Sequence, residues 1–248
     1  MNNIDPLKTA IIIVTYNALD YIKKCFVSLF KHTSIDHEII VIDNASNPET
    51  QKYLDSLHVS GKIQLIKNTE NVLWLPAVNQ GLKVIADDTE YCLLLNSDIE
   101  IFSYDWLLKL QQPMLEDTAI GISGTHYNFL PVKPTYGAID GCCYMLRRDL
   151  IRELGYFDEN YPWNGAPFIY SARAWNIGQY FYHVKNETIL HHHGKKSRLE
   201  NNTQLKNRKV NHFQVMREAG LEPSFDLLSK ILYKLKLFDI NSHIKKMI

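Results

Sequence analysis

The feature that most constrains the fold is a recurring series of short apolar runs, each rich in β-branched residues or leucine and each followed by polar residues. Residues 9–15, 38–43 and 91–95 are such runs, and none alternates with polar residues. This pattern is typical of strands buried on both faces of a parallel sheet. Between them lie segments with apolar residues at helical spacing, the first beginning near Leu19. Strands that alternate with helices predict an α/β fold with a doubly wound, mostly parallel central sheet flanked by helices.

The remaining elements are expected to extend this sheet and to form a separate tail. Asn17 is a candidate cap for the first helix, and Ser46 with Glu49 has the spacing of a capping box for the second, with Pro48 in its first turn. We expect one domain over residues 1–198 and a basic tail over 199–248. Further strands are expected at 62–67, 119–124, 141–147 and 180–191, and further helices at 76–86, 149–154, 171–176 and 227–238.

Charge and cysteine usage narrow the class of protein. The chain of 248 residues has 27 lysines and arginines against 27 aspartates and glutamates, so bulk attraction to nucleic acid is excluded and any charged ligand must be held locally. Four cysteines without a CxxC pair indicate reduced thiols. The first residues have no leader pattern, and no run approaches the roughly 18 to 20 apolar residues of a membrane span. These features predict a cytoplasmic location.

The most informative polar cluster is Asn96-Ser97-Asp98, which directly follows the buried run 91–95. Ligands of doubly wound sheets bind beyond the carboxyl ends of the strands, where such loops converge. A carboxylate there can hold a hard divalent cation that also takes diphosphate oxygens. Asp98 is therefore a candidate metal ligand. The alternative is an ordinary turn in which Asn96 and Asp98 cap backbone amides.

Several motifs occur in an order that resembles a known family. The chain is similar, over residues 8–195, to family 2 glycosyltransferases of the GT-A fold, of the rhamnosyltransferase-like type that builds bacterial surface polysaccharides. The motifs are Ile13-Val-Thr-Tyr-Asn17, Val41-Ile-Asp-Asn-Ala-Ser46, Asn68-Thr-Glu-Asn71 with Asn79-Gln-Gly81, Leu95-Asn-Ser-Asp98, Gly141-Cys-Cys-Tyr-Met-Leu-Arg-Arg148 and Gly155-Tyr-Phe-Asp-Glu159.

The resemblance implies a nucleotide-diphosphate sugar donor, a hydroxyl acceptor on a glycan or lipid-linked glycan, and Mn²⁺ or Mg²⁺. It implies Asp98 and His191 as metal ligands, the latter in the run His191-His-His-Gly-Lys-Lys196. Asp43 would accept hydrogen bonds from the nucleotide, although it could instead begin an Asx turn, and the histidine run could be an exposed polar turn. The implied donor-binding residues are Thr15, Tyr16, Asn17, Asp43, Asn71, Asn79, Asn96, Ser97 and Lys195.

One departure from the family pattern concerns the catalytic base. The family usually carries an acidic pair six or seven residues before an arginine that corresponds to Arg173, but Ala166 and Pro167 stand there. Neither can accept a proton. Asp140 becomes the candidate base because it directly precedes the strand expected at 141–147, whereas Asp158 and Glu159 are more typical of turn and capping bonds. Two alternatives remain open: an acceptor that needs no strong base, and a noncatalytic sugar-nucleotide-binding partner of an active transferase.

Other classes of protein fit the sequence less well, and the tail has two interpretations. No GxGxxG follows the first strand, which disfavours a dinucleotide oxidoreductase. The first strand also lacks the glycine-rich basic loop that a nucleotidyltransferase needs to cradle a triphosphate. The apolar stripe and lysines of the tail fit peripheral contact with the inner face of a membrane, or packing on the domain or a partner.

Overall fold

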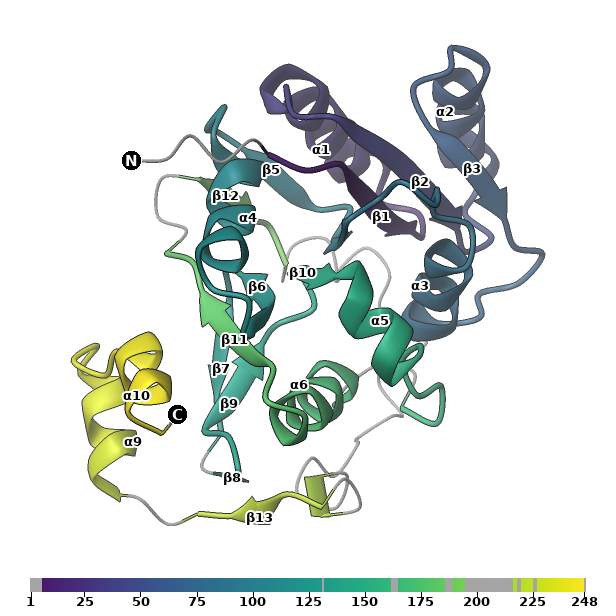
Figure 1. The fold of residues 1–248 in the computed structure, drawn as a ribbon. Helices are drawn as coiled ribbons and strands as arrows, with labels where there is room; N and C mark the ends of the chain where they lie inside the picture. Colours follow the sequence, from purple (N-terminus) through teal and green to yellow (C-terminus); the bar gives the residue numbers. More distant parts are fainter. Residues whose placement is uncertain are drawn as a thin grey trace.

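The computed structural model describes residues 6–130, 132–161, 165–185, 189–194, 216–217, 220–224 and 227–247. Its centre is a seven-stranded sheet with the order β11-β6-β10-β4-β1-β2-β3 (Figure 1). The elements are β1 Thr9–Thr15, α1 Leu19–His32, β2 His37–Asp43, α2 Pro48–Val59, β3 Gln64–Lys67, α3 Trp74–Leu82, β4 Tyr91–Leu95, β5 Ile99–Ile101, α4 Trp106–Glu116, β6 Ile120–Gly124, β7 Tyr127–Phe129, β8 Val132–Lys133, β9 Gly137–Ile139, β10 Cys143–Arg147, α5 Arg148–Leu154, α6 Ala166–Asn176, β11 Tyr180–His183, β12 Leu190–His192, β13 Glu222–Pro223, α9 Leu227–Lys234 and α10 Ile240–Met247.

The expected mostly parallel α/β sheet is confirmed, with one strand reversed. β1 pairs in parallel with β2 and β4, β2 with β3, and β6 with β11. Only β10 among the sheet's described strands is antiparallel, and it lies between β4 and β6. Cys143 pairs with Leu95, and Tyr144 pairs with Gly124. The carboxyl ends of β4 and β6 and the amino end of β10 therefore meet at one edge of the sheet.

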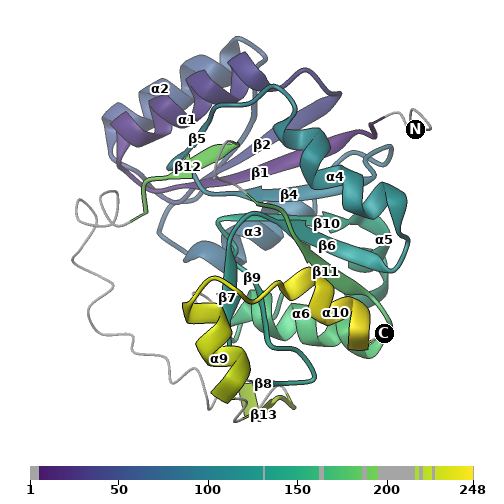
Figure 2. The same cartoon turned by 90° about the vertical axis from the view of Figure 1, so that its left-hand side faces the viewer.

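Helices cover both faces of the sheet, which explains the continuous apolar runs. Ile11 and Ile13 of β1 pack in one core with side chains of α1, α2 and α4, while Ala10 and Ile12 pack in a second core with side chains of α3, α5 and α6. Successive residues of a strand point to opposite faces, so a strand between two helical layers needs apolar residues at every position. Figure 2 shows α1 and α2 on the opposite side of the sheet from α3.

Where the structure departs from the expected elements, local partners explain the difference. The strand expected at 180–191 is two strands, because β11 pairs with β6 only as far as Gly124, where β6 itself ends. β12 pairs instead with β5 in a separate small sheet. The expected capping box does not form, since Asn47 caps α2 by accepting a bond from the Thr50 amide, although Pro48 is in the first turn as predicted.

All four cysteines are buried and unpaired, at positions 25, 92, 142 and 143. Burial raises the pKa of Cys25, Cys92 and Cys143 to about 12. These thiols are therefore protonated at neutral pH and pack as small apolar groups, as the sequence predicts.

Parts of the tail pack on the sheet domain. Ile240 and Ile244 of α10 enter the core beneath β11. The side chain of Asn241 accepts a hydrogen bond from the backbone N–H of His183 and donates one to its carbonyl. β13 pairs with β8. The domain boundary expected between residues 198 and 199 lies outside the described residues. Within the part that is described, no helix is both long and apolar enough to cross a bilayer.

Candidate functional site

The polar cluster Asn96-Ser97-Asp98 lies at the edge where three strands converge. The Asn96 amide donates to the Cys142 carbonyl at 2.9 Å, which joins the end of β4 to the start of β10. Asn96 and Ser97 are half-buried, and the side chain of Asp98 is 11% exposed. The loop therefore turns its carboxylate inward, toward neighbouring side chains.

One side chain that contacts Asp98 is an imidazole. Oδ1 of Asp98 lies 3.3 Å from Nε2 of His192, and the Asn96 Nδ2 lies 3.4 Å from the same nitrogen. The pairing of β12 with β5 holds this contact, since His192 lies opposite Ile99, the residue after Asp98. A carboxylate and an imidazole from two distant segments thus face each other.

His191, the residue expected to join Asp98, is not the histidine that the structure places beside it. His191 lies opposite Glu100 and its side chain is exposed. Its ring contacts that of His193, whose Nε2 is 3.0 Å from Glu100 Oε2. Because successive side chains of a strand point to opposite faces, His191 and His192 of β12 face opposite ways, and the ring contact places His193 on the side of His191. The metal role expected of His191 stays a prediction, and His192 is a further candidate ligand because it is the histidine that contacts Asp98.

Two further Lewis-basic side chains lie beside this pair. The ligating atoms of His126, Cys142 and His192 all lie within 4.8 Å of one another. His126 follows β6 and Cys142 precedes β10, the two strands that meet β4 at this edge. Burial, reinforced by His192, lowers the pKa of His126, and burial with the neighbouring Asp140 raises the pKa of Cys142 well above its ordinary value.

Sequence reasoning missed His126, Cys142 and His192 as members of one cluster. His126 follows its strand in the same way that Asp98 follows β4, so the rule of carboxyl ends could have found it. Cys142 lies within an apolar run, where a thiol is indistinguishable from a core residue. Its place in the cluster depends on the reversal of β10, which the sequence pattern does not show.

Asp43 is fully buried at the end of β2, and both of its oxygens accept hydrogen bonds. The Thr15 hydroxyl donates to Oδ1 at 3.1 Å, and the Ser46 amide donates to Oδ2 at 3.2 Å. The Ser46 bond is the turn-forming contact that the sequence left open as an alternative to nucleotide binding. Asp43 therefore organises the loops after β1 and β2.

Asn17 joins those two loops instead of capping α1. Its Oδ1 accepts the Asn47 amide and its own amide donates to Ser46 Oγ, both at 2.8 Å. Asn17 and Ala18 are both left-handed, with φ of 52° and 57°, and Ala18 occupies the cap position of α1. Left-handed backbone costs free energy outside glycine, so these bonds hold a strained loop. Tyr16 is half-buried in the same loop.

The two other asparagines expected at the donor site bond within the protein. Asn71 Oδ1 accepts the Leu73 amide at the start of α3. Asn79 is 2% exposed, donates to the Phe157 carbonyl and to Glu159 Oε1, and accepts the Phe157 amide. These bonds fix the side chain of Asn79 to the turn that contains Phe157 and Glu159, so Asn79 holds that turn against α3.

The candidate base Asp140 lies at the same edge as Asp98. Its Oδ1 accepts the Cys142 amide at 3.0 Å, and its Oδ2 accepts Nδ2 of Asn128 at 2.7 Å. The Cys142 thiol makes a further side-chain hydrogen bond to the same carboxylate. Asp158 instead bonds the Asn160 amide and lies 3.6 Å from Arg173. Asp158 thus makes the turn contacts that the sequence favours.

The two residues that replace the expected acidic pair lie at the start of α6. Ala166 and Pro167 form the first turn of α6 and are buried. Ala166 packs in the core with Tyr170 and Ala174. The segment is therefore built for packing. Lys195, the expected phosphate contact, lies outside the described residues.

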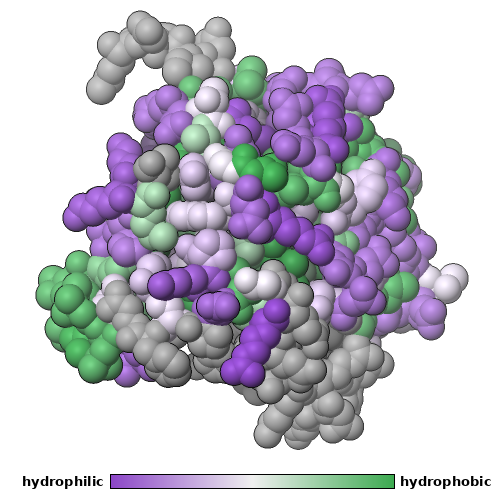
Figure 3. Space-filling model, turned by 60° about the horizontal axis from the view of Figure 1, so that its bottom comes forward, coloured by the Kyte–Doolittle hydropathy of each residue, from purple (hydrophilic) through white to green (hydrophobic). Residues whose placement is uncertain are grey.

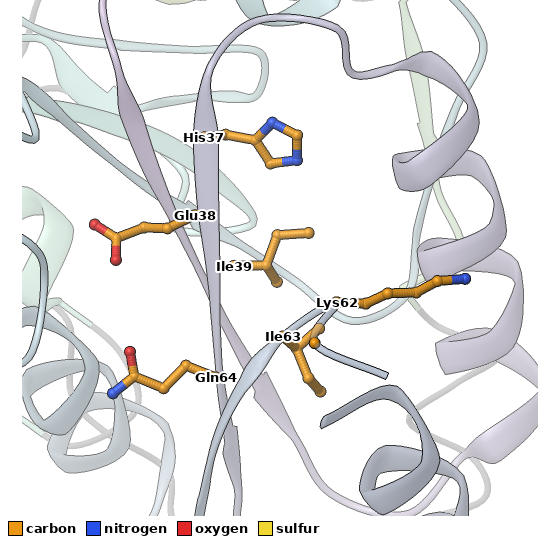
Figure 4. A pocket seen from close by; sticks show the side chains of 7 residues that line it. His37, Glu38, Ile39, Lys62, Ile63 and Gln64 are labelled. Atoms are coloured by element: carbon orange, nitrogen blue, oxygen red, sulfur yellow. The ribbon is translucent and has the colours of Figure 1, made fainter. Parts of the chain in front are cut away.

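The hollow in Figure 4 lies away from these residues. It is lined by His37, Glu38 and Ile39 at the start of β2 and by residues 61–64, which end at the first residue of β3. This is the amino end of the parallel strands, opposite the edge that carries Asp43 and Asp98. Glu38 there accepts the Ala86 amide and the Thr89 hydroxyl, which identifies it as a structural side chain.

The side chains at Asp98 fit the divalent cation that the family resemblance implies. Two ligands held about 2.1 Å from a cation at right angles are about 3.0 Å apart, close to the 3.3 Å between Asp98 and His192. Carboxylate oxygens suit Mn²⁺ and Mg²⁺, and imidazole is a common metal ligand. The pair leaves further positions for oxygens of a ligand or water.

Solved structures with similar folds cover much of the chain. A mannosyltransferase from Pyrobaculum calidifontis in complex with GDP-Man and Mn²⁺ has a TM-score of 0.62 at 17% identity, over 75% of this chain and 57% of that one. GalNAc-T7 with UDP, GalNAc and Mn²⁺ has a TM-score of 0.62 at 19% identity, over 74% and 43%. TarS of S. aureus, residues 1–349, has a TM-score of 0.62 at 15% identity, over 86% and 64%. These likenesses establish the GT-A fold.

Sequence comparison identifies the family. A curated relative, the teichoic acid poly(glycerol phosphate) polymerase of Staphylococcus epidermidis, is 26% identical over 135 residues, which are 54% of this chain and 18% of that protein. This chain thus spans less than a fifth of that relative. The sequence profile of glycosyl transferase family 2 matches residues 10–171, well over half of the chain. The chain therefore belongs to glycosyl transferase family 2.

Proposed function

We propose that this chain transfers a sugar from a nucleotide-diphosphate donor to a hydroxyl group of a bacterial surface glycan, with a divalent cation held by Asp98 and His192. The observation that carries the proposal is the 3.3 Å carboxylate–imidazole pair at the carboxyl edge of a family 2 sheet. A bound Mn²⁺ or Mg²⁺ would stabilise negative charge on the leaving diphosphate. The similar structures with GDP-Man or UDP and Mn²⁺ support this choice of ligand class.

The donor's nucleotide would lie against the loops after β1 and β2. Asp43 is buried beneath them and bonds Thr15 and Ser46, while Asn17 ties one loop to the other. We therefore assign Asp43 the task of holding the pocket's shape, and the loop residues Thr15, Tyr16 and Asn17 that of lining it. A preformed loop lowers the entropy that donor binding must offset.

Asp140 is the proposed base for the acceptor hydroxyl. It shares the edge of the sheet with Asp98, and its two bonds to Cys142 and Asn128 fix the carboxylate. Asp140→Asn should lower transfer about 100-fold, at the lower end of the effect of losing a base, and leave donor binding with Mn²⁺ intact. Transfer at the wild-type rate would exclude Asp140 and favour an acceptor that needs no strong base.

A noncatalytic donor-binding partner remains the competing function, because Ala166 and Pro167 replace the expected acidic pair. A panel of GDP-, UDP- and dTDP-sugars, assayed for hydrolysis and for binding with and without Mn²⁺, separates the two functions. Metal-dependent hydrolysis of one donor supports the enzyme. Metal-dependent binding without hydrolysis or transfer supports the partner, and binding of no donor overturns both.

We propose further that α9 brings the chain to an anionic lipid surface, where a lipid-linked acceptor lies. Apolar side chains gather at one end of the molecule in Figure 3, shown in green at the lower left. Lys230, Lys234 and Lys236 accompany them. Apolar side chains with flanking lysines suit the boundary between acyl chains and anionic headgroups. The exposed residues, each at least 45% accessible, are Leu227, Leu228, Ile231, Leu235 and Leu237.

Vesicle sedimentation tests this surface. The full chain should sediment with phosphatidylglycerol vesicles and stay in solution with phosphatidylcholine vesicles, and Leu228→Gln with Ile231→Gln should abolish sedimentation. Val59→Gln, at an 85% exposed apolar residue on α2, is the matched control and should sediment as the wild type does. Failure to sediment, or a dimer that buries α9, would overturn the lipid assignment.

A further inference from the structure

The cluster beside Asp98 contains more nitrogen and sulfur than a Mn²⁺ or Mg²⁺ site needs. Ligating atoms of His126, Cys142 and His192 lie within 4.8 Å of one another, and His192 is also 3.3 Å from Asp98. Hard cations prefer oxygen, whereas two imidazoles and a thiolate select zinc and similar borderline cations. The donor set is therefore richer than the proposed transfer requires.

We infer that His126, Cys142, His192 and Asp98 form a four-ligand site for Zn²⁺, which closes the cation position used by the sugar donor. The binding site stands on the cluster itself, while its regulatory consequence, inhibition by Zn²⁺, rests on the proposed function. A cation held by four protein ligands leaves no position for diphosphate oxygens, as in closed structural zinc sites.

The geometry needs only a modest contraction. Tetrahedral ligands at zinc distances are about 3.3 Å apart for nitrogen or oxygen pairs and about 3.6 Å for nitrogen and sulfur pairs. The 3.3 Å between Asp98 and His192 meets this value already, and the ligating atoms of His126, Cys142 and His192, which lie within 4.8 Å of one another, must approach by at most about 1.5 Å. On binding, the Cys142 sulfur gives its proton to solvent and bonds the cation as thiolate.

The surroundings of the cluster orient its members. The Thr125 hydroxyl lies 3.0 Å from Nδ1 of His126, and the Cys142 amide donates to Asp140. The pairing of β12 with β5 fixes His192. Such outer contacts hold metal ligands in position and raise affinity. His126 follows β6, Cys142 precedes β10 and His192 ends β12, so the cation would also tie these three strands together.

Titration with Co²⁺, a spectroscopic substitute for Zn²⁺, tests the site without an activity assay. The wild type should show intense tetrahedral cobalt bands together with thiolate-to-cobalt charge transfer, and Zn²⁺ should displace both. Cys142→Ser should lose the charge-transfer band. His126→Ala should weaken Co²⁺ binding at least 10- to 100-fold, the range for loss of even an outer-shell partner.

Cys143→Ser is the matched control, because Cys143 is the adjacent buried thiol outside the cluster and should keep the wild-type spectrum. Weak octahedral bands without charge transfer in the wild type would overturn the site, with no variant needed. Calorimetry of donor binding with Mn²⁺, with and without Zn²⁺, separates the outcomes. If the cobalt bands appear but no donor binds, the zinc site is supported and the proposed transfer is overturned. If a donor binds equally well with and without Zn²⁺, the proposed inhibition is overturned.

Discussion

Asp43 and Asp98 each follow a buried strand of the same sheet, yet their surroundings differ in kind. Donors surround Asp43: the Thr15 hydroxyl and the Ser46 amide bond its two oxygens. Lewis bases gather near Asp98: His192 at 3.3 Å, with His126 and Cys142 beside it. A carboxylate whose two oxygens accept hydrogen bonds from neighbouring loops holds those loops together, whereas a carboxylate beside imidazole and thiol groups can share a cation with them. The first is suited to hold loops, and the second to bind metal.

The largest expected effect is the loss of transfer activity when Asp98 is replaced. Asp98→Ala should lower transfer about a thousandfold or more, since a metal Lewis acid supplies several kcal/mol of transition-state stabilisation. The unfolding free energy should fall by about 1–2 kcal/mol, because the variant loses the 3.3 Å contact of a buried carboxylate with His192. Steady-state kinetics with Mn²⁺ and urea unfolding measure the two quantities.

Asp149→Ala removes an exposed carboxylate from α5 and serves as the control for Asp98→Ala. It should leave both kinetics and stability at wild-type values. Donor binding by Asp98→Ala that still responds to Mn²⁺ would show that the cation lies elsewhere.

Replacing Asp43 should lower the stability of the fold more than replacing Asp98 does. Asp43→Ala leaves the buried Ser46 amide and Thr15 hydroxyl without their acceptor, and an unsatisfied buried donor costs about 1–3 kcal/mol. Stability should therefore fall by about 2–4 kcal/mol in urea unfolding. Asp43→Asn should cost less, because its remaining oxygen can accept the amide while the hydroxyl rotates to accept from Nδ2. Equal losses in both variants would mean that the charge, and not the bonding pattern, matters.

The contrast also separates what the sequence could predict from what it could not. Residues 9–15 and 91–95 are strands with the predicted bounds, because continuous apolar runs report burial on both faces. The convergence of polar residues at the carboxyl edge followed from the same topology. By contrast, the choice of His192 over His191 depends on the register of β12 with β5, which no local pattern encodes.

Cap assignments failed for a related reason. Asn17 and Ser46 have side chains that suit caps, and each uses that capacity across the chain instead, on the other's loop. Side chains of Asn and Ser can bond any nearby backbone group, so sequence spacing predicts a cap only where no tertiary partner competes. Asn71 and Asn79, predicted to bind the donor, likewise bond groups of the protein itself: Asn71 bonds Leu73, and Asn79 bonds Phe157 and Glu159.

Asn17 offers a smaller test of the loop side. Asn17→Ala loses the bond to the Asn47 amide and places alanine at a φ of 52°, so stability should fall by about 1–2 kcal/mol. Asn17→Gly also loses the bond but tolerates that φ, and should lose less. Urea unfolding of both variants separates strain from bonding. A larger loss in the glycine variant would show that the backbone conformation is not strained.

The smallest expected effect is a pH dependence at the end of β11. Burial lowers the pKa of His183 below its ordinary value of about 6.5. The folded state therefore binds this proton less readily than the unfolded state, so stability is lost as the pH falls below about 6.5 toward the folded pKa. His183→Gln removes that penalty. The variant should lose less stability than the wild type between about pH 7.5 and about pH 5.5 in urea unfolding. Equal losses in both proteins would contradict this role of His183 and point to other groups, such as His126, a second described histidine whose pKa burial lowers.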